Sequence, residues 1–302
     1  MRKWLIFLRL LRVKQWTKNA IVFAAFIFAL GDPAQHLDAG ELWKVALAAL
    51  AFALVSSAVY IFNDWRDLEL DRLHPVKRNR PLASGVIRPG PALRLAVVLL
   101  ALGLGIAWRL SMPLLMVLGG YLLLQAAYSL KLKHIPLVDV MVISLGFVLR
   151  TLAGAVVIDV DVSPWLLLCA MLLSLFLGLC KRRHEAVNLA GQGTRTALMQ
   201  YDERLLDLLI TMMGASTLIC YSIYTLWPDT VAKFGTPWLA ATIPFVVFGL
   251  FRYMDLVYRQ DKGDRPEQIL LTDGPLMVCV ALYGLTVLSV LLGRSGGGGY
   301  GA

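Results

Sequence analysis

Nine long apolar runs dominate this sequence and decide what it can fold into. Most are close to the ~20 residues that an α-helix needs to cross the hydrocarbon core of a bilayer. Apolar residues make up 58% of the 302 residues and charged residues only 16%. Soluble domains carry about 25% charged residues, so a soluble domain is excluded, and a disordered chain would be far more polar. The runs cover residues 17–31, 43–63, 92–110, 112–130, 136–158, 163–180, 204–227, 236–258 and 274–293.

The runs predict an all-α polytopic membrane protein with nine transmembrane helices. Residues 1–16 are basic and amphipathic, which is typical of a helix that lies on the membrane surface. Residues 17–293 then form one nine-helix domain, and the glycine-rich residues 294–302 form a flexible tail. The core of the first run, residues 20–30, has the length of a signal-peptide core. Because no clean small-x-small cleavage site follows it, we expect a retained helix.

Positive charge is distributed unevenly between the connecting segments. Of the 29 lysines and arginines, 22 lie in the N-terminus and the loops on its side, and four lie on the other side. Loops rich in lysine and arginine stay in the cytoplasm, so the N-terminus and both long loops, 64–91 and 181–203, are expected there. The net charge of +9 is therefore a one-sided membrane-protein surface. Nucleic acid binding is not expected, because no soluble domain presents this charge.

A row of acidic side chains follows the second apolar run directly. If that helix continues, Asp64, Asp67 and Asp71 lie at i, i+3 and i+7 on one face, with Asn63 one turn from Asp67. Crowded carboxylates need a cation, and Mg²⁺ prefers oxygen ligands from one or two carboxylates plus a substrate phosphate. A solvated helix end with acids paired to nearby arginines is the alternative. However, Asn63 and Asp64 begin at membrane depth, where polarity is costly.

A basic run, Lys77-Arg78-Asn79-Arg80, lies immediately downstream of these acids. Taken alone, such a run more often fixes membrane topology. Beside an acidic cluster, the run is suited to bind a diphosphate that is coordinated to a metal ion, because arginine guanidinium groups bind the phosphate oxygens that the metal leaves free. We therefore expect Lys77, Arg78 and Arg80 to bind a diphosphate.

The pattern Asn63-Asp-x-x-Asp67-x-x-x-Asp71, followed by Lys77-Arg-x-Arg-Pro81, resembles the first signature of the UbiA-type prenyltransferase superfamily. The resemblance implies a UbiA-like bundle and a catalytic Mg²⁺–diphosphate site. Tyr128 and Lys133 resemble a tyrosine–lysine element of the family that contacts phosphate. The residues implied to hold Mg²⁺ are Asn63, Asp64, Asp67 and Asp71, and Asp67, Asp71 and Lys133 are expected to be catalytic.

The segment after the sixth apolar run departs from the usual family pattern. Ordinary members carry a second acidic motif there, whereas this chain has Lys181-Arg182-Arg183, with Glu185 as the remaining acid. Cations in this place favour two phosphate-bearing substrates. One branch of the superfamily, the decaprenyl-phosphate phosphoribosyltransferases, is implied to use such a pair. Segments similar to that branch include Gln15-Trp16-x-Lys18-Asn19, Ser57-Ala58-Val59-Tyr60, Leu149-Arg150-x-Leu-Ala153-Gly154, and Arg252-Tyr253 with Asp273.

This resemblance implies transfer of 5-phosphoribose from 5-phosphoribose 1-diphosphate (PRPP) to a polyprenyl phosphate, in the plasma membrane of a bacterium. The product would be a lipid-linked sugar donor precursor for envelope polysaccharide. Glu185 is expected to be catalytic and to hold ribose hydroxyls, and Asn19 to bind substrate. The candidates for the lipid phosphate and the ribose 5-phosphate, without distinguishing which binds which, are Lys18, Lys133, Lys181 and Arg182.

Two alternatives remain at this stage. A UbiA-type enzyme that prenylates an aromatic acceptor is the nearest, and the missing second acidic motif argues against it. A transporter is the other, but inverted repeats and helices broken at mid-membrane are not evident. The role of Arg150 is open between holding backbone carbonyls and touching substrate. Self-association into a homo-oligomer is left open as well.

Overall fold

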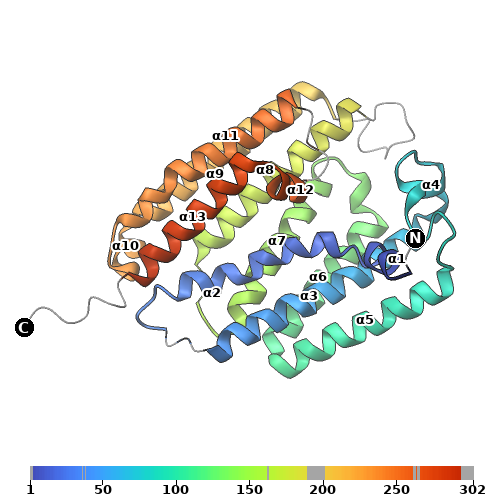
Figure 1. Cartoon of the computed structure of the whole chain (residues 1–302), viewed down its shortest axis with the longest axis horizontal. Coiled ribbons are helices and arrows are strands. Elements are labelled where there is room, and N and C mark those ends of the chain that lie inside the picture. Colours follow the sequence, from blue (N-terminus) through green and yellow to red (C-terminus); the bar gives the residue numbers. More distant parts are fainter. Residues whose placement is uncertain are drawn as a thin grey trace, which may run out of the picture.

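The computed structural model describes residues 3–35, 37, 39–161, 163–188, 201–260, 263 and 266–293. Within these residues all regular secondary structure is helical, which confirms the all-α prediction. Eight helical segments are long and apolar enough to cross a membrane, and they form one bundle (Figure 1). They are α3 (Ala39–Arg66), α5 (Pro89–Leu110), α6 (Met112–Leu130), α7 (Val138–Val156), α8 (Pro164–Asn188), α9 (Glu203–Leu226), α11 (Ile243–Arg259) with η5 (Trp238–Thr242) before it, and α13 (Gly274–Leu292).

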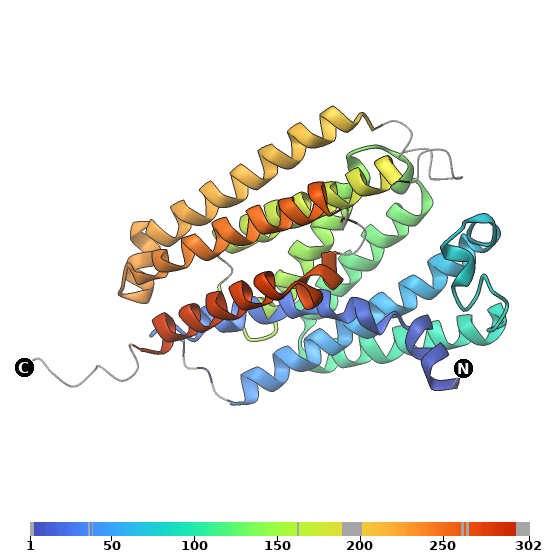
Figure 2. The ribbon, with the colours of Figure 1, turned by 45° about the horizontal axis from the view of Figure 1, so that its top comes forward.

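The first apolar run differs from the long α-helix that its composition predicts. Val13–Phe23 form an 11-residue 3₁₀-helix, η1, and Ala24–Ala29 form a 6-residue α-helix, α2. A 3₁₀-helix rises ~2.0 Å per residue and rarely exceeds four residues, whereas an α-helix rises 1.5 Å. Together η1 and α2 therefore extend over about 30 Å, close to the thickness of the hydrocarbon core. Figure 2 shows this segment passing along the bundle.

Close packing against α3 and α7 fixes this irregular segment. A Cβ atom on Gly154 would lie 1.8 Å from the carbonyl oxygen of Val22, so only glycine allows the two backbones to approach. The indole N–H of Trp16 donates to Ser57 Oγ at 3.1 Å. The Ser57 hydroxyl in turn donates to the carbonyl of Leu11 at 2.9 Å. Two segments that share the family resemblance, 41 residues apart in the chain, therefore meet here.

Short helices cap the bundle. At the end where α3 finishes lie α1 (Lys3–Leu10), α4 (Leu68–Leu73), η2 (Lys77–Asn79) and η3 (Leu132–His134); the remaining short helices are α10 (Pro228–Phe234) and α12 (Pro266–Thr272). Helix α1 exposes Trp4 and Phe7 and ends at Leu10, whereas an amphipathic surface helix over residues 1–16 stays a prediction. Helix α8 extends to Asn188, so the start of the predicted 181–203 loop is helical. The predicted tail, 294–302, lies outside the described residues.

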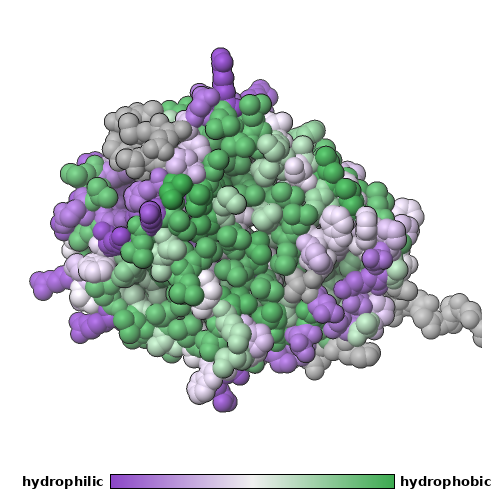
Figure 3. Space-filling model, turned by 180° about the vertical axis from the view of Figure 1, so that it is seen from behind, coloured by the Kyte–Doolittle hydropathy of each residue, from purple (hydrophilic) through white to green (hydrophobic). Residues whose placement is uncertain are grey.

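The outer surface of the bundle is apolar. Large hydrophobic side chains such as Leu123, Met116 and Val97 are about two-thirds exposed or more. On the face seen in Figure 3, hydrophobic residues cover the middle and hydrophilic residues gather toward the two ends. Contiguous apolar surface of this extent marks a membrane-facing protein. The chain is thus a multi-pass membrane protein.

Candidate active site

Three aspartates gather where α3 meets α4. Asn63 and Asp64 lie in the last turn of α3, Asp67 lies at the junction, and Asp71 lies in α4. The Asp67 N–H donates to the Asn63 carbonyl at 2.9 Å, and the Asp71 N–H to the Asp67 carbonyl at 2.8 Å. Because these bonds keep helical spacing across the junction, the expected row of acids survives the helix break. We call Asp64, Asp67 and Asp71 the carboxylate cluster.

Cations from three other segments hold this cluster. Nη1 of Arg80 donates to Asp64 Oδ1 at 3.0 Å and to Asp71 Oδ2 at 2.6 Å. Asp64 also pairs with Arg12, which precedes η1. Asp67 accepts from Lys133 Nζ at 2.7 Å. Asp64 and Asp71 are each 3% exposed, and buried carboxylates need such partners.

Residues at the C-terminal end of α6 and in η3 also contact Asn63 and the carboxylate cluster. The Ser129 hydroxyl donates to Asn63 Oδ1 at 2.5 Å. Lys133, in η3, is 8% exposed, and its carbon stem is therefore packed while its ammonium reaches Asp67. The structure thus brings Lys133 to Asp67 and Ser129 to Asn63, while the metal- and substrate-binding roles of Asn63 and Lys133 stay predictions.

A second charged group lies on α8 and the start of α7. Arg182 is 5% exposed, and its Nε lies 2.9 Å from Asp139 Oδ2 as an ion pair. Its Nη1 donates to Glu185, and Lys181 Nζ lies 3.9 Å from the same carboxylate. Tyr201 donates from its hydroxyl to Asp139 Oδ1 at 2.8 Å. We call Lys181, Arg182, Asp139 and Glu185 the α8 group.

His74 lies between the two groups. Its Nδ1 accepts from the N–H of Val76 at 3.2 Å and of Lys77 at 3.3 Å. Burial, and next the charge of Lys77, lower the pKa of His74 below its ordinary value, while Asp71 and Glu185 act in the opposite direction. The imidazole is therefore within electrostatic range of one acid from each group.

The remaining predicted residues lie in different surroundings. Lys18 is half-buried in η1, Lys77 is half-buried in η2, and Arg78 is exposed. Asn19 is 5% exposed and accepts from Arg150 Nε at 2.9 Å. Its structural partner is therefore the intramembrane arginine, and its substrate-binding role stays a prediction.

Each guanidinium nitrogen of Arg150 has a protein partner. Besides Asn19, its Nη1 donates to the Gly146 carbonyl at 2.8 Å and its Nη2 to the Tyr121 hydroxyl at 3.2 Å. Its guanidinium also lies 5.3 Å from the ring centre of Phe52, within cation–π range. Of the two roles left open by the sequence, the structure supports the structural one. Arg252 is likewise held, by Asp273 at 2.8 Å and 3.1 Å.

Several residues of the site escaped the sequence analysis. Arg12 had no signal beyond its positive charge, because its approach to Asp64 depends on the course of the N-terminal segment. Asp139 could have been singled out, since an acid at the start of an apolar helix is costly unless paired. Tyr201 and Ser129 have no local signal, and His74 lacks any metal-type spacing.

The carboxylate cluster can hold a divalent cation together with a substrate. In the described part of the chain no three acidic, histidine or cysteine side chains already converge on one point. Asp64 and Asp71 do converge, because both bind the same nitrogen of Arg80. Two carboxylates plus substrate phosphate oxygens match what Mg²⁺ accepts, so the donor set fits when phosphate supplies the remaining ligands.

Fold and site together define a class of protein. It is an all-helical, multi-pass membrane protein that has carboxylates, and lysine and arginine side chains of the kind that bind phosphate, at one end of its bundle. A comparison with protein families carries this further, since the sequence profile of the UbiA prenyltransferase family matches residues 20–272. The chain belongs to this family.

Similar proteins include curated relatives and solved structures. A decaprenyl-phosphate phosphoribosyltransferase from Mycolicibacterium smegmatis is 34% identical, over 90% of this chain and 87% of that protein. The one from Corynebacterium glutamicum is 36% identical, over 90% of this chain and 82% of its own length. Among solved structures, a UbiA homolog from Archaeoglobus fulgidus, bound to GPP and Mg²⁺, superposes with a TM-score of 0.70. It covers 95% of this chain and 99% of its own, and at 21% identity the likeness concerns the fold alone.

Proposed function

We propose that this protein transfers 5-phosphoribose from PRPP to a polyprenyl phosphate and releases diphosphate. The observation that carries the proposal is the similarity to the two phosphoribosyltransferases along nearly the whole chain. The α8 group supports it physically, because Lys181 and Arg182 place positive charge where the family pattern leads one to expect a second metal-binding motif. Two phosphate-bearing substrates would use that charge directly.

Mg²⁺ is the metal that this proposal requires. Asn63, Asp67 and Asp71, with Asp64 in support, would hold it. A bound divalent cation neutralises the diphosphate oxygens and makes diphosphate a better leaving group.

The cations of the site would then bind the donor. Lys77, Arg78 and Arg80 are placed in or beside η2, next to the carboxylate cluster, and would take the free diphosphate oxygens as charge-assisted hydrogen bonds. Lys133 in η3 and Tyr128 near the end of α6 would contribute further contacts to phosphate. Arg80 and Lys133 bind aspartates in the structure, so donor binding requires them to exchange carboxylate oxygens for phosphate oxygens.

The transfer itself needs little proton chemistry. An oxygen of the lipid phosphate attacks C1 of the ribose, the bond from C1 to the diphosphate oxygen breaks, and diphosphate leaves with the electron pair. A lipid phosphate is already anionic at neutral pH, so no general base is required. Lys18, Lys181 and Arg182 would bind the lipid phosphate and the ribose 5-phosphate, and Glu185 would accept from ribose hydroxyls. Positioning and charge neutralisation would supply most of the rate.

We further infer that η1 and α2 form a ninth crossing, with the N-terminus and the carboxylate cluster facing the cytoplasm of a bacterium. The length of this segment supports the crossing. The 22 lysines and arginines on the N-terminal side, against four on the other, support the orientation. This orientation would put the site on the side where soluble PRPP is available.

The alternative is prenylation of an aromatic acceptor from a prenyl diphosphate. One assay separates the two activities: purified protein with Mg²⁺, labelled PRPP and polyprenyl phosphate, scored for a labelled lipid. A parallel reaction contains prenyl diphosphate and 4-hydroxybenzoate. We expect labelled lipid in the first reaction and no prenylated product in the second. The reverse result would replace the proposal with the alternative.

A further inference from the structure

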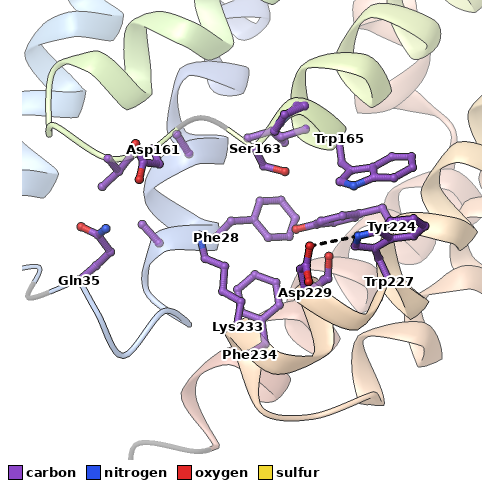
Figure 4. A pocket seen from close by; sticks show the side chains of 16 residues that line it. Phe28, Gln35, Asp161, Ser163, Trp165, Tyr224, Trp227, Asp229, Lys233 and Phe234 are labelled. Atoms are coloured by element: carbon purple, nitrogen blue, oxygen red, sulfur yellow. Dashed lines mark hydrogen bonds between the residues drawn. The ribbon is translucent and has the colours of Figure 1, made fainter.

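A cavity lies at the end of the bundle opposite the carboxylate cluster. Its volume is about 320 Å³, within the range of small-ligand pockets. Figure 1 shows α2 and α10 at this end, and α4 at the other. The walls come from α2, the start of α8, the end of α9 and α10, as the close view in Figure 4 shows. The proposed phosphoribosyl transfer makes no use of this cavity.

Two largely buried residues in the wall have hydroxyls that a ligand in the cavity could reach. Tyr224 is 5% exposed and Thr230 is 6% exposed, and both line the cavity. Neither hydroxyl makes a hydrogen bond within the described part of the chain. In Figure 4 the hydroxyl end of Tyr224 is directed toward the cavity, beside Phe28. Both hydroxyls line the cavity, so a ligand with hydrogen-bonding capacity could bond to them.

The charge at the mouth of the cavity decides the sign of that ligand. Asp161 and Asp229 line the mouth and are both exposed. Asp229 accepts from the indole N–H of Trp227 at 3.3 Å, and neither acid has an ion pair among the described residues. Lys233, the cation in the lining, is already paired with Asp32 at 3.0 Å. The mouth is therefore net negative, which disfavours phosphates and other anions.

Aromatic side chains form much of the wall. The rings of Trp165 and Trp227 lie 5.4 Å apart, and those of Phe28 and Tyr224 lie 6.1 Å apart. Aromatic faces attract cations, most strongly when the cation leaves water. Aromatic walls, two unpaired carboxylates and two unpartnered hydroxyls together match an organic cation with N–H donors.

We propose that this cavity binds a primary alkylammonium group. The aspartates neutralise its charge, the rings surround its carbon atoms, and the hydroxyls of Tyr224 and Thr230 accept its N–H bonds. The walls lie at helix ends, where membrane head groups are found, so the ammonium can belong to an aminophospholipid or to a soluble amine. Because α2 is one wall, a bound ammonium links the N-terminal segment to α9 and α10 and raises the melting temperature.

Calorimetry with ethanolamine tests the proposal on the full-length protein in phosphatidylglycerol nanodiscs. Ethylene glycol, which has the same size but no charge, is the control ligand. We expect saturable binding of ethanolamine and none of ethylene glycol. Asp229→Asn should weaken binding roughly tenfold, and Tyr224→Phe should weaken it by a smaller factor. Asp159→Asn is the matched control variant, since Asp159 lies near this end but does not line the cavity.

Asparagine tolerates the positive φ of residue 159, so the control should bind ethanolamine within about twofold of the wild type. Equal binding of ethylene glycol, or unchanged binding after Asp229→Asn, would overturn the proposal. A second arm repeats the titration in phosphatidylethanolamine nanodiscs. Loss of ethanolamine binding there identifies the lipid head group as the occupant. Retention identifies a soluble amine as the ligand.

Discussion

The carboxylate cluster and the Arg150 site are two solutions to the same problem, which is charge buried in a membrane bundle. Arg150 binds a carbonyl, an amide oxygen, a tyrosine hydroxyl and aromatic rings. Its partners are neutral, and none of them is an anionic group that a substrate phosphate could replace. The aspartates are instead paired with the cations Arg12, Arg80 and Lys133.

The difference lies in what can replace the partners. A substrate phosphate can replace an aspartate as the partner of Arg80 or Lys133. A divalent cation can replace these side chains as the partner of an aspartate. In both cases the incoming group has the same sign of charge as the group that it replaces. Nothing in a substrate can replace the four kinds of contact at Arg150 at once. A buried charge that is paired with opposite charges can exchange its partners for a substrate or a metal ion. A buried charge that is bonded to neutral dipoles keeps its partners. Removal of the acids should therefore cost activity, and removal of Arg150 should cost stability.

The largest effect is expected at Asp71. Asp71→Asn keeps the shape of the side chain but removes one charge that the metal and Arg80 share, so phosphoribosyl transfer should fall about a thousandfold. Chelation of metal with EDTA should abolish activity, and Mg²⁺ should restore it. Product formation and thermal melting are measured together. Glu69→Gln is the control, because Glu69 is an exposed acid on the same helix, paired with Arg72. Full activity without metal would remove the cluster from the mechanism.

Lys181→Asp should produce the next largest effect. It places a negative charge where the proposal puts a substrate phosphate, and at an effective dielectric of ~20 this reversal is worth about a hundredfold in kcat/KM for PRPP. Lys131→Asp is the matched control, since Lys131 is an exposed lysine at the end of α6. Unchanged PRPP kinetics in Lys181→Asp would exclude this lysine from the site.

Arg150→Gln tests the other half of the comparison. Glutamine cannot reach all of the partners, so buried oxygens at Asn19 and Tyr121 lose their donor. We expect a loss of about 2 kcal/mol in the free energy of unfolding, with an unchanged KM for PRPP in the protein that remains folded. Denaturant unfolding and steady-state kinetics provide the two readouts. A raised KM without a loss of stability would place Arg150 at the substrate instead.

The smallest effect concerns pH and His74. Because burial and Lys77 lower its pKa in the folded chain, the unfolded chain binds the proton more readily. The contribution of His74 to the stability of the folded chain is therefore fully present above the ordinary pKa of 6.5, where the imidazole is neutral. It is lost as the pH falls below that value and through the lowered pKa of the folded chain. His74→Gln should flatten the acidic limb of the melting temperature against pH, whereas His134→Gln, at an exposed position, should not. Parallel curves for wild type and His74→Gln would contradict this assignment.

The sequence predicts the parts of this molecule that depend on local spacing. The spacing of Asp64, Asp67 and Asp71 survives because helical hydrogen bonds continue across the α3–α4 junction. Apolar runs predict eight crossings well, but apolarity alone cannot distinguish an α-helix from the 3₁₀-helix at Val13–Phe23. The partners of that segment decide its form, and Gly154, its closest contact, lies over a hundred residues away.

Long-range partners explain the remaining gaps. Arg12 joins the carboxylate cluster across 52 residues, and Tyr201 joins Asp139 across 62. Neither pairing leaves a trace in local composition. Asn19 shows the converse case, in which a residue in a motif-like segment has a partner, Arg150, that the motif does not reveal.

The N-terminal segment also constrains how the protein is assembled. It is synthesised before the residues that it binds, because Ser57 follows Trp16 by 41 residues and Arg150 follows Asn19 by 131. Until α7 enters the bilayer, the backbone of η1 has no glycine groove to enter and Asn19 has no guanidinium to bind. The earliest part of the chain must therefore wait for the middle of the chain before it takes its final form. The N-terminal segment is therefore made before α3 and α7 but reaches its final packing only after them.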